Sequence, residues 1–84
     1  MSNYTWYVVE KGFDLESGFK KLAFPVRVSN SYNLHGYFDR QMNVYEGVKG
    51  YIISINACKT KKVAVECAAS WNECAKGNGL YLFS

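Results

Sequence analysis

An amphipathic repeat in the last third of the chain is the feature that most constrains the fold. Between Thr60 and Lys76, apolar side chains recur three and four residues apart, while charged side chains take the positions between them. This spacing is typical of an α-helix with one buried face. The apolar stripe consists of Ala64, Cys67, Ala68, Trp71, Cys74 and Ala75.

Both ends of this helix carry capping signals. The Thr60 hydroxyl can accept a hydrogen bond from the first turn. At the other end, Lys76 places a cation on the last turn, and Gly77 suits the left-handed conformation that ends many helices. We therefore predict one helix from Thr60 to Lys76, packed through its stripe on the rest of the chain.

Three segments have the composition and alternation of β-strands, namely Asn3–Glu10, Ala23–Ser29 and Val48–Asn56. Pro25 cannot donate to a ladder, so it places the second strand at a sheet edge or at the strand's own start. The third strand is rich in β-branched residues, and we expect it to be central and buried on both faces for part of its length. Gly50 is a candidate bulge in this strand.

The segments between these strands are less regular. Phe13–Leu22 mixes charged residues with glycine and serine, and we predict a loop there. A stripe at helical spacing follows the candidate N-caps Ser29 and Ser31 and predicts a short helix from about Ser31 to Gln41. A turn is expected over Asn43–Gly47. The residues of the short stripe are Leu34, Tyr37, Phe38 and Met42.

These elements predict an α+β fold in a single domain over residues 1–84, because a chain of 84 residues is expected to build one hydrophobic core. The architecture is a small three- or four-stranded, mainly antiparallel sheet with the C-terminal amphipathic helix packed on a face and a short additional helix. Residues 80–83 have room for a last short strand. The expected order is β-β-α-β-α-β.

Composition limits the functional classes. The chain is 49% hydrophobic and 17% aromatic, with a net charge of +3. This charge argues against a nucleic-acid mimic, which needs a dense acidic surface, and it is below the basicity of typical DNA-binding domains. Neither a signal peptide nor a membrane span is visible, so we expect a cytoplasmic protein of a bacterial host, without membrane contact, as a monomer or homodimer.

Cysteine and histidine spacing favours neither metal binding nor catalysis. Cys58, Cys67, Cys74 and the single histidine His35 are too widely spaced for structural zinc. Cys67 and Cys74 lie on the apolar stripe and are interpreted as reduced core residues. Cys58 has the lysine-rich setting of reactive thiols, but no general base is evident. Asp14, Asp39 and Glu46 show no acid–base pattern, so we expect no enzyme activity, cofactor or metal.

Lys59, Lys61 and Lys62 surround the predicted N-cap Thr60. Cations are unfavourable there because the helix dipole is positive at its start. The lysines are consistent with an exposed turn kept soluble by charge. They are also consistent with a site for an anion, or for a carboxylate from the neighbourhood of the third strand or from a partner protein.

Exposed tyrosines are a second candidate surface, since so small a domain cannot bury all its aromatic side chains. Tyr7, Tyr32 and Tyr45 are the candidates, because they lie beside polar residues or on the strand face opposite Trp6. Tyrosine can anchor a protein interface or stack on a base.

The last third of the chain resembles small uncharacterised proteins of Firmicutes phages and mobile elements. The resemblance rests on a strand, a capped helix with a Trp-Asn pair, and an Asn-Gly end, with residues Ile55–Lys62, Ala64, Glu66, Ala68, Trp71–Cys74, Asn78, Gly79, Tyr81 and Phe83. It implies a phage or mobile-element origin. Small proteins of this kind often inhibit a host defence or regulatory complex, as anti-CRISPR proteins do, and this analogy does not depend on fold.

Our leading hypothesis is therefore a non-enzymatic protein-binding module that inhibits a host protein or protein–nucleic-acid complex through Lys59, Lys61, Lys62 and the candidate tyrosines. The alternative is a small nucleic-acid or nucleotide-binding protein in which the same lysines hold phosphates. A thiol enzyme centred on Cys58 is a third, minor alternative.

Overall fold

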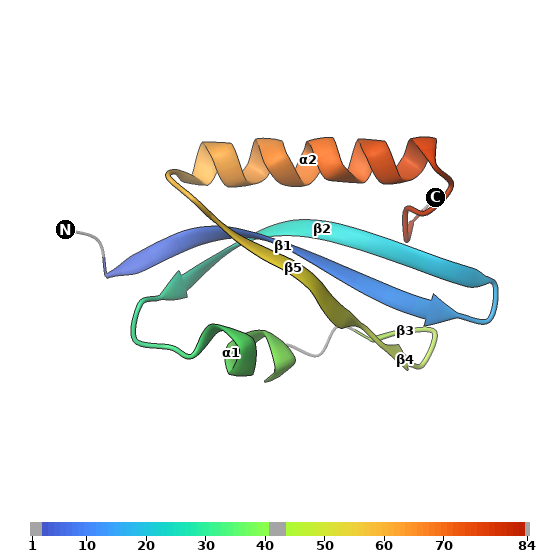
Figure 1. Ribbon diagram of the computed structural model, residues 1–84, viewed down its shortest axis with the longest axis horizontal. Coiled ribbons are helices and arrows are strands. Elements are labelled where there is room, and N and C mark those ends of the chain that lie inside the picture. Colours follow the sequence, from blue (N-terminus) through green and yellow to red (C-terminus); the bar gives the residue numbers. More distant parts are fainter. Residues whose placement is uncertain (1–2, 41–43, 84) are drawn as a thin grey trace.

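A long β-hairpin is the frame of the structure, a computed structural model in which residues 3–40 and 44–83 are described (Figure 1). Strand β1 (Tyr4–Leu15) pairs antiparallel with β2 (Gly18–Ser29) along its whole length. The predicted loop over Phe13–Leu22 is therefore wrong. Phe13 and Leu15 continue the alternation of β1 and are buried, and Gly18 supplies the positive φ of 126° that closes the turn.

Strand β5 (Tyr51–Cys58) pairs with the other side of β1, which gives an antiparallel sheet of order β2-β1-β5. The predicted mainly antiparallel sheet is confirmed, but β1 is its central strand. The expectation that the third strand is central is wrong, and Ile53 is 42% exposed. The bulge lies at Ile53, which has no partner on β1 between the pairs at Ser54 and Ile52, and Gly50 precedes the strand.

Helix α2 (Lys61–Gly77) covers one face of the sheet, over β2 and β1 more than over β5 (Figure 1). The hydroxyl of Thr60 accepts a hydrogen bond from Val63 N at 3.2 Å, so Thr60 is the N-cap as predicted. The predicted left-handed Gly77 is wrong. Gly77 is the last helical residue, and Gly79 takes the positive φ, at 71°.

Helix α1 (Leu34–Arg40) lies on the opposite face of the sheet. Its Phe38 is fully buried against Val9 and Val28. The N-cap is Asn33, whose side-chain oxygen accepts from Gly36 N at 3.0 Å, and neither Ser29 nor Ser31 has this role. The helix begins at Leu34, three residues later than predicted. Its expected end at Gln41 and the stripe residue Met42 lie outside the described residues, as do the side chains of His35, Asp39 and Arg40.

Two short strands, β3 (Val44–Tyr45) and β4 (Val48–Lys49), form a second small sheet beside the hairpin tip. Glu46 and Gly47 both have positive φ in the turn between them, within the described part of the predicted 43–47 turn. The predicted last strand over 80–83 is reduced to a single parallel bridge between Tyr81 and Lys21. The order is thus β-β-α-β-β-β-α, which differs from the predicted one.

In the described part of the chain, most buried residues form three clusters along a molecule that extends 45 Å in its longest direction. One cluster, with Val8, Ala23 and Ala68, joins α2 to the sheet, and a second joins α1 to the other face. The third lies at the hairpin tip, where Leu82 packs on Phe13 and Leu15. The C-terminal segment after α2 thus closes the end of the hairpin.

Candidate binding surface

The register of the sheet brings a cation and an aromatic side chain together at the end where α2 begins. Trp6 in the central strand lies opposite Arg27 of β2 and opposite Cys58 of β5. Opposite residues of neighbouring strands share one face of the sheet, so these three form a row across it. The chain continues from Cys58 directly into Lys59 and the start of α2.

Two cation–π contacts organise this end. The Arg27 guanidinium lies 4.4 Å from the centroid of the Tyr4 ring, and the Lys61 ammonium lies 5.7 Å from that of Trp6. Such contacts contribute about 0.5 to 1 kcal/mol each at exposed sites. They restrict two long side chains before any partner arrives, which reduces the entropy lost on binding.

None of the cations at this end forms an ion pair among the described residues. Arg27, Lys59, Lys61 and Lys62 are all exposed. The ion pairs found in the described part of the chain join other lysines, Lys21 with Glu10 and Lys76 with Glu73, and the first turn of α2 has no acidic residue. We call the set Tyr4, Trp6, Arg27, Lys59, Lys61 and Lys62 the basic end. Its chemistry suits carboxylates and phosphates.

The three candidate tyrosines are distributed over the molecule. Tyr32 is 53% exposed and follows β2, whose last residue Ser29 lies opposite Tyr4, but the Tyr32 ring lies 5.3 Å from that of Tyr37 in α1. Tyr7 is half-buried in the cluster that contacts α1. Tyr45 is half-buried at the hairpin tip, with its ring 5.8 Å from that of Phe83. The structure therefore brings only Tyr32 to the end of the sheet where the predicted lysines lie, and there its ring contacts α1 rather than α2.

Sequence reasoning missed the other half of the basic end. It identified the three lysines, but it did not connect them with Tyr4, Trp6 and Arg27. The signal that could have found them is the alternation that continues through Phe13 and Leu15, because a long hairpin in this register sets Trp6 opposite Arg27.

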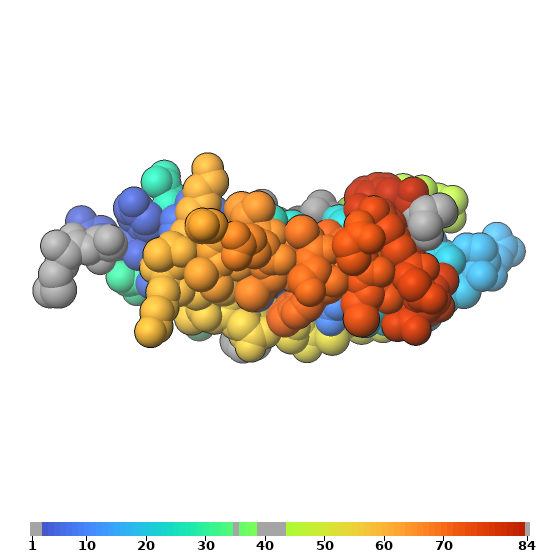
Figure 2. Space-filling view, turned by 90° about the horizontal axis from the view of Figure 1, so that it is seen from above, coloured from blue at the N-terminus to red at the C-terminus, as the bar shows by residue number. Residues whose placement is uncertain are grey.

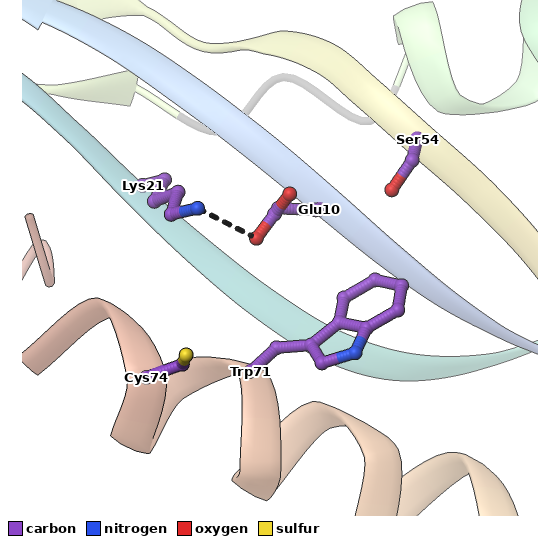
Figure 3. A pocket seen from close by; sticks show the side chains of 5 residues that line it. All are labelled: Glu10, Lys21, Ser54, Trp71 and Cys74. Atoms are coloured by element: carbon purple, nitrogen blue, oxygen red, sulfur yellow. Dashed lines mark ion pairs between the residues drawn. The ribbon is translucent and has the colours of Figure 1, made fainter.

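A cleft of about 340 Å³ opens between α2 and the sheet (Figure 3). The carboxylate of Glu10 pairs with Lys21 at 3.6 Å on its sheet side, and Ser54 and Trp71 also line it. Trp71, a residue of the predicted apolar stripe, packs on the α2 cluster as expected but is only half-buried. The two charges of the cleft already neutralise each other. An ionic ligand would have to break their pair, which makes the cleft a weaker candidate than the basic end.

The cysteines divide by exposure. Cys58 and Cys67 are half-buried, whereas Cys74 is exposed and lines the cleft. The interpretation of Cys74 as a core residue is therefore wrong, because its side chain borders the open cleft between α2 and the sheet (Figure 3). Within residues 3–40 and 44–83, no three His, Cys, Asp or Glu side chains gather into a group that could hold a metal ion.

Two ionisable groups away from the basic end are perturbed. Partial desolvation and the nearby carboxylate of Asp14, which the hydroxyl contacts at 3.5 Å, raise the pKa of Tyr51 above its ordinary value. The hydrogen bond to Glu73 and its negative charge raise the pKa of Lys76. Neither group contributes to the basic end.

No family model, curated protein or solved structure matches this chain. In the part of the chain that the structure describes, neither helix combines the length and hydrophobicity needed to cross a bilayer.

Proposed function

We propose that this chain is a small non-enzymatic binding protein that uses its basic end to dock on an anionic surface of a host protein or protein–nucleic-acid complex. The observation that supports this most is the fixed position of Arg27 over Tyr4, beside three lysines without carboxylate partners among the described residues. A guanidinium that lies over a ring still has N–H groups that can form bidentate contacts with a carboxylate or phosphate.

The finer part of the proposal is that the partner is a defence or regulatory complex in the cytoplasm of a bacterial host, which the protein inhibits. The resemblance of the last third of the chain to phage and mobile-element proteins motivates it. An anti-CRISPR role is the most specific form. Docking through charge would let so small a protein block an anionic surface without any catalytic group.

The binding test uses the tagged wild-type chain and its tagged variants to capture host proteins from a bacterial lysate, and compares how much of each host protein is recovered. We expect Arg27→Ala and Lys62→Ala each to reduce recovery of the same partner severalfold, because each removes a cation that contacts it. Lys49→Ala is the matched control, since Lys49 is an exposed cation on β4 at the other end of the molecule. Equal recovery by all variants would remove the basic end from the binding surface.

The inhibition test measures plasmid transformation in cells with an active CRISPR system. Expression of the wild-type chain is expected to restore transformation, and Arg27→Ala is expected to lose this effect. If binding survives in the lysate but transformation is not restored, the docking proposal stands and the anti-CRISPR role fails.

Nucleic-acid binding is the second candidate, because cations and aromatic rings share the basic end. Both rings are already contacted by cations, however, which hinders base stacking on those faces. A labelled single-stranded oligonucleotide distinguishes the two candidates. Tight binding that weakens steeply with salt would favour the nucleic-acid reading, whereas no binding at moderate salt favours a protein partner.

A further inference from the structure

The two edges of the main sheet differ in how their outward backbone groups are used. On β2, the segment 80–82 bonds both backbone groups of Lys21, at 2.7 and 3.0 Å. The side chain of Asn72 bonds both backbone groups of Ala23, at 2.8 and 2.9 Å. Pro25, two residues further along, has no N–H to offer. This edge is therefore closed to another strand from Lys21 to Pro25.

The edge formed by β5 is open. Along an antiparallel strand, the N–H and C=O groups of successive residues point alternately to one side of the strand and to the other. The outward hydrogen bonds of Lys21 and Ala23 on β2 therefore determine which residues of β1 and β5 direct their backbone groups to which side. By this alternation Ser54 and Asn56 bond to β1, and Ile55 and Ala57 direct their backbone groups outward. Among the described residues, no hydrogen bond on this outer side reaches Ile55 or Ala57.

This open edge lacks the usual protection. Exposed edge strands are normally blunted by charged side chains or proline, and Tyr51–Cys58 contains neither. Tyr51 is 46% and Ile53 is 42% exposed. In the view from above, β5 emerges along one long side of α2, uncovered by the helix (Figure 2). The strand thus offers both backbone and apolar surface.

We propose that β5 pairs antiparallel with β5 of a second copy of this chain, about a two-fold axis, to form a continuous six-stranded sheet. A second copy fits because the strand is uncharged, so pairing with itself places no like charges inside the ladder. This inference does not rest on the proposed function: it uses one cation of the basic end, Lys59, and leaves Arg27, Lys61 and Lys62 exposed for an anionic partner.

Charge at the strand ends favours the antiparallel direction. Lys59 follows the end of β5, and at the start of β5 the Tyr51 hydroxyl contacts the carboxylate of Asp14. Asp14 is exposed and has no ion pair within the described residues. Antiparallel pairing brings Lys59 of each copy to Asp14 of the other, whereas parallel pairing would bring the two Lys59 side chains together.

The same charges select the register. A pairing centred on Ser54 would set Lys59 opposite Lys49 of the second copy, and like charges directly opposite are destabilising. A pairing centred on Ile55 instead sets Lys59 opposite Tyr51, beside Asp14. Of these two pairings, the charges favour the one with its two-fold axis at Ile55.

Sedimentation equilibrium of the full chain tests the dimer. The mass is expected to rise from the 9.6 kDa of one chain toward twice that value as the concentration increases. Hydrogen exchange at the amides of Ile55 and Ala57 should slow over the same range, because pairing protects them. A constant mass of one chain up to millimolar concentration would overturn the proposal.

A matched pair of variants locates the interface. Ile53→Lys places a charge on the open edge and is expected to weaken the dimer about tenfold or more, since each dimer contains it twice. Val65→Lys makes the same change at a residue 43% exposed on α2, and should leave the dimer intact. Circular dichroism verifies that both variants fold. If Ile53→Lys leaves the dimer dissociation constant unchanged, or if both variants weaken the dimer equally, the edge pairing is contradicted.

A charge exchange tests the register. Lys59→Glu and Asp14→Lys should each weaken the dimer, and the double variant should recover most of the loss, because the pair is restored with its charges exchanged. Additive losses in the double variant would show that Lys59 and Asp14 do not meet, and would reject the register centred on Ile55.

Discussion

The side-chain amide of Asn72 pairs with both backbone groups of Ala23: its nitrogen donates to Ala23 O at 2.9 Å, and its oxygen accepts from Ala23 N at 2.8 Å. A single side chain on α2 thus takes the place of a neighbouring strand along β2. Ala23 is only 3% exposed, so without the Asn72 side chain its backbone N–H and C=O would have little access to water.

Asn72→Ala should therefore lower the free energy of unfolding by about 1 to 3 kcal/mol, because it leaves a buried donor and a buried acceptor unsatisfied. Urea denaturation followed by circular dichroism measures the loss. Asn78→Ala is the matched control, since its side chain donates one exposed hydrogen bond to Cys74 O at 3.1 Å. Equal losses in the two variants would mean that the Ala23 pairing contributes little.

Lys62→Glu should raise stability while it weakens binding. A carboxylate in the first turn of α2 interacts favourably with the helix dipole by about 0.3 to 1 kcal/mol at low salt. Repulsion from Glu66, four residues further along the helix, reduces this gain by about 0.2 to 0.5 kcal/mol. Lys61→Glu should gain less, because it also removes the ammonium that lies over Trp6. Thermal melting gives the stability, and lysate capture gives the binding. A stabilised Lys62→Glu protein that captures its partner normally would exclude Lys62 from the contact.

In the native protein, Cys74 should be the first thiol to react with a chromogenic aromatic disulfide, whose reaction is followed by absorbance. It is exposed, whereas Cys58 and Cys67 are half-buried. Cys74→Ser should remove the fast phase and leave the slower ones. If the fast phase persists in this variant, another cysteine is the accessible one, and the orientation of this turn of α2 is wrong.

Trp71→Ala should destabilise the protein by about 2 kcal/mol, less than the about 3 to 5 kcal/mol typical of a fully buried aromatic residue, because part of the ring faces the cleft. Trp71→Phe keeps the contact with Val8 and Ala68 and should recover most of the stability. Chemical denaturation of both variants measures the difference. An unchanged midpoint in Trp71→Ala would show that the ring does not hold α2 on the sheet.

Local signals in the sequence were sufficient for α2 and for the sheet class. The Thr60 cap and the stripe with Ala64 and Ala68 act within a few turns, so they can be recognised without knowledge of the fold. The end of the same helix was misplaced because two glycines follow it closely, and only tertiary context selects Gly79 over Gly77.

Pairing between distant strands determines the features that local sequence patterns could not predict, namely the length of the hairpin, the strand order and the basic end. Charged residues such as Lys20 and Lys21 made the hairpin tip look like a loop, yet they lie in β2 opposite Phe13 and Gly12. The strand Tyr51–Cys58 is as apolar as a central strand, but β1 takes that place. The basic end depends on this pairing, which explains why its lysines were predicted and its Arg27 was not.

The location of the basic end has a consequence for how the molecule meets its partner. Electrostatic fields in physiological salt decay over about 8 Å, far less than the 45 Å length of the molecule. An approaching anionic surface therefore senses the four cations of the near end rather than the net charge of +3. The resulting torque turns the molecule end-on before contact, so that a larger share of random collisions begins in a productive orientation.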